Sequence, residues 1–400
     1  MLKINKYKSP WFLMISSAAI LMITMGVRQS TGLFLLPIDT STGLGIVSIS
    51  FAFAVGQFFW GLAQPIFGII ADKKGSYHVL VTGALFLAGG LALTPLATSE
   101  WSLTLTMGVL SAVGAGAGSF SILIGSTAQQ LSQERRAFAA GFINAGGSFG
   151  QFIFAPLLQA IIGGFGWVTA IMTMAATSLL TIPLAKSLCG DDVPGGHAET
   201  ATDSIGLRQQ IKQAMVNLSY LCLHAGFFTC GFHIAFLVTH LPGEVALCGH
   251  SANVSAVSLA LIGLFNIGGS LCAGMLGSRY RMKYILAVMY GSRAVMIGLY
   301  LLAPKTILTF YVFAGGLGFT WLATVPPTAG LVGKLFGTRY LATLFGLTLL
   351  THQIGGFLGA WLGGLVMAHD GNYQWMWYAD MLLALLAAVV NLPIREEKIA

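Results

Sequence analysis

Three ionisable residues lie well inside long apolar stretches of the sequence: Arg28, Arg293 and Asp380. A charged side chain at the centre of a bilayer costs about 2.5–3.5 kcal/mol on insertion scales, so it persists where it is paired, hydrated or functional. A guanidinium is a planar fork that binds a carboxylate through two hydrogen bonds and stays charged at any relevant pH. The chemistry available to these residues is therefore ion pairing or anion binding inside an apolar medium.

Four histidines also lie in apolar stretches: His224, His233, His240 and His352. A lone histidine in a membrane helix is most simply a hydrogen-bonded packing residue. His233 and His352 lie near the middle of their stretches, and histidine titrates near neutral pH, so either could carry a proton or add a second cationic group. No carboxylate or thiol is spaced to complete a metal site, and the five cysteines form no Cys-x-x-Cys pair. The sequence thus predicts neither a metal nor another cofactor.

Uncharged polar residues recur at helical spacing. Asn144, Ser148 and Gln151 fall at positions i, i+4 and i+7, and Asn266 and Ser270 at i and i+4. Thr348 and His352 are also four apart, next to Gln353. Hydrogen bonds between helices explain such stripes more often than ligand contact does, and both interpretations stay open.

The elements that must position these residues are membrane helices. The chain has 400 residues, of which 56% are hydrophobic and 8% charged, whereas soluble domains average about 25% charged residues. Its 51 glycines suit membrane helices, where glycine lets backbones approach closely. These values exclude soluble enzymes, nucleic-acid-binding proteins and secreted disulfide-rich domains.

Apolar stretches bounded by charges or turn residues predict an all-α protein with twelve transmembrane spans. The longest polar connection, 187–214, divides them into an N-terminal bundle (1–190), a cytoplasmic linker (191–213) and a C-terminal bundle (214–400). The predicted spans are 11–38, 46–71, 77–97, 101–127, 137–163, 167–186, 215–240, 252–276, 283–303, 306–331, 338–367 and 373–393. In the tenth, Trp321, Thr324 and the Pro326-Pro327 pair predict a kink, which could serve as a gate or only as a packing feature.

The positions of lysine and arginine predict the orientation of these spans. With the N-terminus in the cytoplasm, 17 of the 20 cations fall in inside segments and only Lys305 in an outside loop. Both termini are therefore predicted to be cytoplasmic. The net charge of +7 is then a consequence of topology and does not indicate a nucleic-acid partner.

The two halves also resemble each other. The segment 68–80 has a counterpart at 274–286, an offset of 206, and the glycine-rich stretches from Gly141 and Gly346 are offset by 205. A duplicated six-helix unit places a substrate site between the halves, near the bilayer midplane.

With twelve spans, a long central loop and the loop pattern Gly68, Asp72, Lys73 and Gly75, the chain resembles the major facilitator superfamily. In that family the loop is a cytoplasmic latch between the halves, and its Asp meets a helix N-terminus, as helix-dipole physics favours. The basic residues that usually follow the second glycine are Ser76 and Tyr77 here, so the pattern is partial. A plain positive-inside loop is the alternative.

Within the superfamily, the arginine in span one and the glycine-rich spans five and eleven are most similar to the bacterial monocarboxylate and oxalate/formate-type transporters. Span one lacks the acid-Gly pair of animal-type monocarboxylate porters, and span eight holds Asn266 and Ser270 but no charge. The proton-coupling residues of those porters therefore have no counterpart here. The signatures of drug exporters in spans four and five are also missing.

The superfamily fold implies that spans nine and twelve are neighbours outside the central cavity, which predicts a structural ion pair between Arg293 and Asp380. Asp380 as a proton carrier is the rival interpretation. Arg28 is then left without an acid partner on a cavity-lining span, where it would bind a substrate carboxylate; the alternative is an arginine satisfied by backbone carbonyls and amide side chains. The candidate substrate contacts are Arg28, Thr31, Asn144, Gln151, His233, His352 and Gln353, with His233 and His352 as candidates for proton coupling.

These expectations describe a secondary transporter that moves a small carboxylate-bearing anion by alternating access, with proton symport favoured over anion exchange. The sequence has no nucleotide-binding loop. The alternatives are a larger polycarboxylate such as a citrate-type siderophore, a zwitterion, export of amphiphilic compounds, and a non-transporting membrane sensor. The expected surroundings are membrane lipid, most simply the bacterial inner membrane, and the expected state is a monomer.

Overall fold

The computed structural model describes residues 10–131, 133–188, 206–277, 279–337 and 341–396, and the elements in these ranges are helices without strands. The main helices of the N-terminal half are α1 (Pro10–Gln29), η1 (Thr31–Phe34), α2 (Leu35–Thr42), α3 (Ile46–Lys74), α4 (Ser76–Leu93), α5 (Glu100–Leu103), η3 (Thr104–Leu110), α6 (Ser111–Ala117), α7 (Phe120–Gln129), α8 (Gln133–Leu179) and α9 (Thr181–Ala185). Those that follow are α10 (Leu207–Met215), α11 (Leu218–Leu247), α12 (Ala252–Gly277), α13 (Met282–Leu302), α14 (Ile307–Thr320), α15 (Val325–Phe336), α16 (Leu341–Asp370) and α17 (Gln374–Val390).

Ten helical segments in the described ranges are long and apolar enough to cross a membrane. The longest, Gly141–Leu188, covers most of the predicted span 137–163 and all of 167–186, and its backbone breaks at Gly166, where φ is 84°. Such a positive φ is readily adopted only by glycine. The last predicted span corresponds to α17, which at 17 residues is shorter than the ten. All the predicted spans have helical counterparts, while twelve membrane crossings stay a prediction.

The outside of the bundle is covered by apolar side chains. Leu302 is 87% exposed, Phe165 76% and Val288 70%, and many other large hydrophobic residues share this position. A water-soluble monomer rarely exposes contiguous apolar surface of this kind. The apolar outer surface of the bundle is therefore suited to contact the acyl chains of a lipid bilayer.

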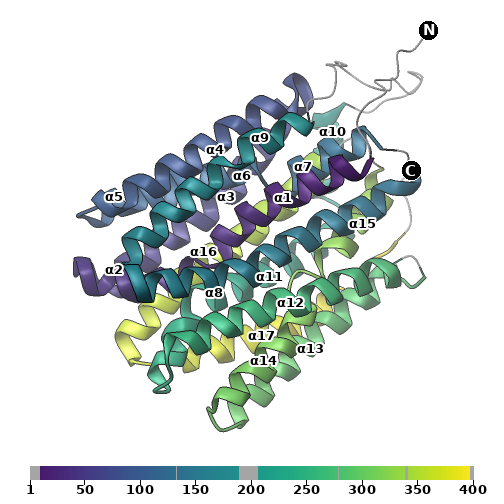
Figure 1. Ribbon diagram of the computed structural model, residues 1–400. Coiled ribbons are helices and arrows are strands. Elements are labelled where there is room, and N and C mark those ends of the chain that lie inside the picture. Colours follow the sequence, from purple (N-terminus) through teal and green to yellow (C-terminus); the bar gives the residue numbers. More distant parts are fainter. Residues whose placement is uncertain (1–9, 132, 189–205, 278, 338–340, 397–400) are drawn as a thin grey trace.

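The two halves lie side by side and meet along a seam. In Figure 1, α4, α5, α6 and α9 occupy one side of the molecule and α12, α13, α14 and α17 the other. The seam consists of the contacts of α3 with α16 and of α8 with α12, which are among the most extensive between any two helices. Glycines allow this approach, because a Cβ on Gly364 would lie 2.6 Å from the Cβ of Ser50, and one on Gly263 would lie 2.7 Å from the carbonyl oxygen of Ser148.

One end of the bundle gathers segments that the sequence predicts to be cytoplasmic. Lys334 pairs with Glu396 at 3.1 Å, and Gln210 of α10 donates to the carbonyl oxygen of Phe336 at 2.7 Å. Helix α10, which was not predicted, begins inside the proposed linker 191–213 and lies at the end of the bundle where α1 begins (Figure 1). The membrane face that this end meets stays a prediction, and residues 191–205 lie outside the described ranges.

The latch pattern lies at the junction of α3 and α4. Gly75 has a φ of 85° and forms the turn between these helices. Gly68 lies on α3 in open space, since a Cβ added there would meet no heavy atom within 4 Å. The side chains of Asp72 and Lys73 lie outside the described part of the structure, so the latch stays a prediction.

Candidate functional site

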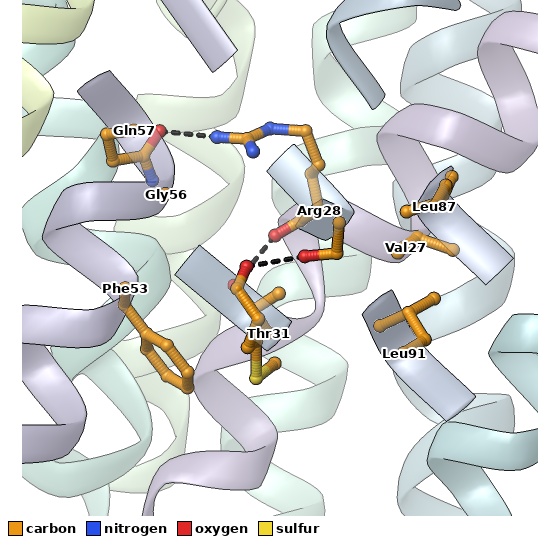
Figure 2. A pocket seen from close by; sticks show the side chains of 10 residues that line it. Val27, Arg28, Thr31, Phe53, Gly56, Gln57, Leu87 and Leu91 are labelled. Carbon is orange, nitrogen blue, oxygen red and sulfur yellow. Dashed lines mark hydrogen bonds between the residues drawn. The ribbon is translucent and has the colours of Figure 1, made fainter. Parts of the chain in front are cut away.

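Arg28 lies in the last turn of α1, and its side chain reaches across to α3. Its Nη2 atom donates a hydrogen bond of 2.5 Å to Oε1 of Gln57, as Figure 2 shows, and its guanidinium carbon lies 4.2 Å from the centre of the Trp60 ring. Gln57 and Trp60 are three residues apart on α3, so they share one face of that helix. Both partners are uncharged, and no ion pair in the described ranges involves Arg28. Its positive charge is therefore held in place but not neutralised by an acid.

Arg28 lies between two cavities. The interhalf cavity is small and is lined from the first half by Arg28, Gln29, Gln57 and Trp60, among others. From the second half it is lined by Gly231, Ile234 and Ala235 of α11, Leu322, and His352 and Gln353 of α16. The cavity thus lies between the halves, where a duplicated fold is expected to hold a substrate.

The second cavity, called here the first-half cavity, lies within the N-terminal half. Arg28, Gln57 and Thr31 line it together with apolar side chains such as Leu91 (Figure 2). Met107 lines it as well. The Thr31 hydroxyl donates to the carbonyl oxygen of Arg28 at 2.9 Å. Met107 belongs to η3, a π-helical segment, and such segments are frequent at functional sites.

The polar groups of the interhalf cavity suit a small anion. One guanidinium, the amides of Gln29, Gln57 and Gln353 and the imidazole of His352 are set among apolar walls. Nε2 of Gln353 lies 2.7 Å from Nδ1 of His352, so the amide donates and the ring accepts. A guanidinium can bind a carboxylate there, and the amides can contact hydroxyl or keto groups on the same molecule.

The predicted substrate contacts divide into two groups. Arg28, Thr31, His352 and Gln353 line one of the two cavities. Asn144 instead donates to Ser270 at 3.0 Å across the seam, which is the helix-to-helix hydrogen bond that was the alternative to ligand contact. Gln151 and His233 are buried, at 1% exposure each, and line neither of these two cavities.

The predicted ion pair between Arg293 and Asp380 is wrong in its partners. Nδ1 of His233 lies 2.5 Å from Oδ2 of Asp380, and both residues are fully buried in the C-terminal half. Arg293 donates instead to the carbonyl oxygens of Thr320 and Trp321 and to Sγ of Cys230. The physical reason is the predicted kink, since the chain leaves helical geometry between α14 and α15 and frees carbonyl groups that a guanidinium can satisfy.

Sequence reasoning did not identify Gln57 and Trp60 as partners of Arg28. The available signal was weak: Gln57 is one of few polar residues in the stretch 46–71, and an aromatic residue follows at i+3. The other two membrane histidines are packing residues, as expected, since His224 bonds to Thr351 at 2.6 Å and His240 to the carbonyl oxygen of Ala360 at 2.7 Å.

The chain is similar to known membrane transporters over most of its length. Residues 15–360 match the sequence model of the Major Facilitator Superfamily. The chain is 26% identical over 396 residues to Monocarboxylate transporter 13 of Rattus norvegicus, covering 96% of this chain and 89% of that protein. It is 23% identical over 367 residues to the Oxalate:formate antiporter of Oxalobacter formigenes, covering 91% and 86%, and 23% identical over 400 residues to the MFS-type transporter YcxA of Bacillus subtilis, covering 96% and 94%.

Proposed function

The chain belongs to the Major Facilitator Superfamily, and from that membership we propose that it moves a small carboxylate-bearing anion by alternating access. It is a multi-pass membrane transporter and not an enzyme. In this proposal the halves 1–190 and 214–400 rock around the interhalf cavity, and twelve spans place both termini in the cytoplasm. We propose a monomer in a cell membrane, most simply the bacterial inner membrane.

The observation that carries the proposal is the unneutralised guanidinium of Arg28 at the interhalf cavity. A single cation beside uncharged amides attracts anions and repels cations. One guanidinium matches one carboxylate, and Arg28 is the one charged side chain among the described residues that line the interhalf cavity. A citrate-type siderophore would leave further carboxylates without cationic partners, which disfavours that alternative. Among similar proteins, those named as monocarboxylate and oxalate:formate transporters support the same class of substrate.

Proton symport is the proposed source of energy. Histidine is the side chain whose ordinary titration falls between pH 5 and 8, and the chain places His352 at the interhalf cavity and His233 in the core of the second half. A proton that moves together with a monocarboxylate makes each transport cycle electrically neutral.

Transport by the purified full chain in proteoliposomes tests this proposal. Labelled lactate, formate and oxalate are offered with and without an inward proton gradient, alongside neutral glucose and cationic choline. We expect at least one acid to be transported, and Arg28→Ala to lower its uptake about 10–100-fold, the range for a lost hydrogen bond to a charged group.

Two further variants control this experiment. Arg28→Lys keeps the charge but loses the fork, so it is expected to retain part of the uptake. Arg208→Ala removes an exposed arginine on α10, away from both cavities, and is expected to transport as the native chain does. Transport of glucose or choline with none of the three acids would contradict the proposal.

A further inference from the structure

A second group of ionisable side chains lies in the core of the C-terminal half, apart from the interhalf cavity. This core cluster consists of His233 on α11, Asp380 on α17 and Arg293 on α13, each at most 1% exposed. His233 and Asp380 are in contact at 2.5 Å, and Arg293 contacts Sγ of Cys230, one turn before His233, at 3.3 Å.

The charge of the core cluster depends on one proton. Arg293 and Asp380 carry opposite charges, so the protonation of His233 decides whether the cluster is neutral or positive. Nδ1 of His233 is engaged by Asp380, whereas Nε2 of His233 and Oδ1 of Asp380 are buried and have no hydrogen-bond partner in the described part of the chain. Of these two groups, an imidazole is ordinarily the stronger base.

The titratable groups that contact the cluster are Cys230 on α11 and Tyr290 on α13, both beside Arg293, and His352 on α16 interacts in turn with Cys230. Farther along the same helices, α11 carries His224, His240 and Glu244, and α13 carries Tyr300.

The core cluster is connected to the interhalf cavity through the break between α14 and α15. Arg293 holds the carbonyl oxygens of Thr320 and Trp321, and the ring of His233 lies 5.6 Å from that of Trp321. The next residue, Leu322, lines the interhalf cavity.

The same break is also connected to the first half. The backbone N–H of Leu322 donates to Oδ1 of Asn266 at 2.9 Å. Nδ2 of Asn266 in turn donates across the seam to the hydroxyl of Ser148 at 2.8 Å. The core cluster therefore contacts a segment that in turn contacts both the cavity and the opposite half.

We propose that the His233–Asp380 pair carries the coupled proton, and that the break between α14 and α15 transmits its protonation state to the cavity and the seam. The inference rests on the proposed carboxylate–proton symport and assigns the proton to a place within it. The proton enters from one side of the membrane, binds Nε2 of His233 while Asp380 stays ionised, and leaves to the other side after the halves rock. Arg28 and His352 then serve the substrate, and Arg293 is a positioning residue for the break.

The variant that tests this assignment is His233→Asn. The asparagine amide nitrogen takes about the place of Nδ1, so it can still donate to Asp380, but it cannot titrate. The charges of Arg293 and Asp380 remain balanced, so a buried acid is not left unopposed. His233→Gln serves as a second variant if the first does not fold, with the thermal unfolding midpoint as the measure of folding.

Two transport modes are measured in proteoliposomes, with whichever of lactate, formate and oxalate the native chain moves fastest. One is uptake driven by an inward proton gradient, and the other is exchange of labelled for unlabelled acid at equal pH on both sides. We expect the exchange rate of His233→Asn to stay within about threefold of the native rate, which corresponds to a change of less than 1 kcal/mol in the activation free energy. We expect its uptake to be no longer stimulated by the proton gradient.

Two control variants, His352→Asn and His224→Asn, are compared with His233→Asn. His352→Asn is expected to bind substrate more weakly but keep the stimulation, and His224→Asn, on the same helix as His233, is expected to keep both modes. The assignment would be overturned if folded His233→Asn kept the native stimulation of uptake by the proton gradient. It would also be overturned if the variant lost exchange and stimulation to the same extent. A native chain that moves none of the three acids, or an Arg28→Ala variant with full exchange, would instead contradict the proposed function.

Discussion

The charge of Arg28 stays available because its hydrogen-bond partner is an amide and not an acid. The substitution Gln57→Glu places a carboxylate at the same distance, where it would pair with the guanidinium and compete with the substrate. We expect the KM for the transported acid to rise about 10–100-fold, the range for hydrogen bonds to charged groups. Initial uptake rates over a range of substrate concentrations provide the measurement.

Gln57→Ala is the matched control for that prediction. It removes the same hydrogen bond without adding a charge, and Trp60 still lies against the guanidinium. We expect a change in KM of about threefold or less, since a cation–π contact at a partly exposed site contributes about 0.5–1 kcal/mol. Equal effects of the two substitutions would show that neutralisation of Arg28 is not what lowers binding.

For single residues, the sequence predicted which side chains lie inside the membrane better than it predicted which groups they contact. Arg28 was identified because an arginine in an apolar run is visible without any structure. Its contacts with Gln57 and Trp60 depend on how α1 and α3 are rotated about their axes, which periodicity alone does not determine. Arg293 was wrongly predicted as the partner of Asp380, because the sequence did not show that the backbone carbonyls at the helix break would accept hydrogen bonds from Arg293.

At the scale of elements, two adjacent glycines of α12 differ sharply in their surroundings. A Cβ on Gly269 would overlap the carbonyl oxygen of Phe319 on α14, whereas one on Gly268 would come no closer than 3.9 Å to the Phe319 ring. We therefore expect Gly269→Ala to destabilise the protein by about 1–3 kcal/mol through overpacking. The thermal unfolding midpoint in detergent, compared with that of the native chain, measures this.

Gly268→Ala is the matched control, since it adds the same methyl group to the same helix at the neighbouring position. Alanine favours a helix over glycine by about 1 kcal/mol, so the expected effect is a neutral or slightly raised midpoint. A midpoint as low as that of Gly269→Ala would mean that the close contact with Phe319 does not limit packing.

Helix positions were predicted well because hydropathy and the lengths needed to cross a bilayer constrain them. The prolines at 326 and 327 indicated the interruption that the structure places between α14 and α15. The break at Gly166 matches the predicted boundary between spans five and six. Helix α10 was missed because its sequence is polar and lies in the connection between halves.

At the scale of the whole molecule, the sequence duplication predicted two bundles with a site between them, and the interhalf cavity lies at such a place. The close fit of the seam was not predictable, because it depends on which glycines of one half meet which residues of the other. In the described conformation, the start of α3 and the last third of α16 are in contact through Ser50 and Gly364. The proposed alternating access would require this contact to separate during each transport cycle.

A disulfide across the seam tests that requirement. The Cβ atoms of Ser50 and Gly364 would lie 2.6 Å apart, so a shift of about 1 Å brings a cysteine pair into the usual range of 3.5–4.5 Å. We expect the oxidised Ser50→Cys/Gly364→Cys double variant to stop transporting the acid and to recover when a reductant breaks the bond. Gel mobility after proteolytic cleavage between the halves reports cross-linking, and proteoliposome uptake reports activity.

The matched control is Gly83→Cys/Ala117→Cys, which joins α4 to α6 within one half at a similarly close contact. Because each half is expected to move as a unit, this cross-link should leave transport intact, and full uptake by the fully oxidised seam variant would contradict rocking of the halves about this contact.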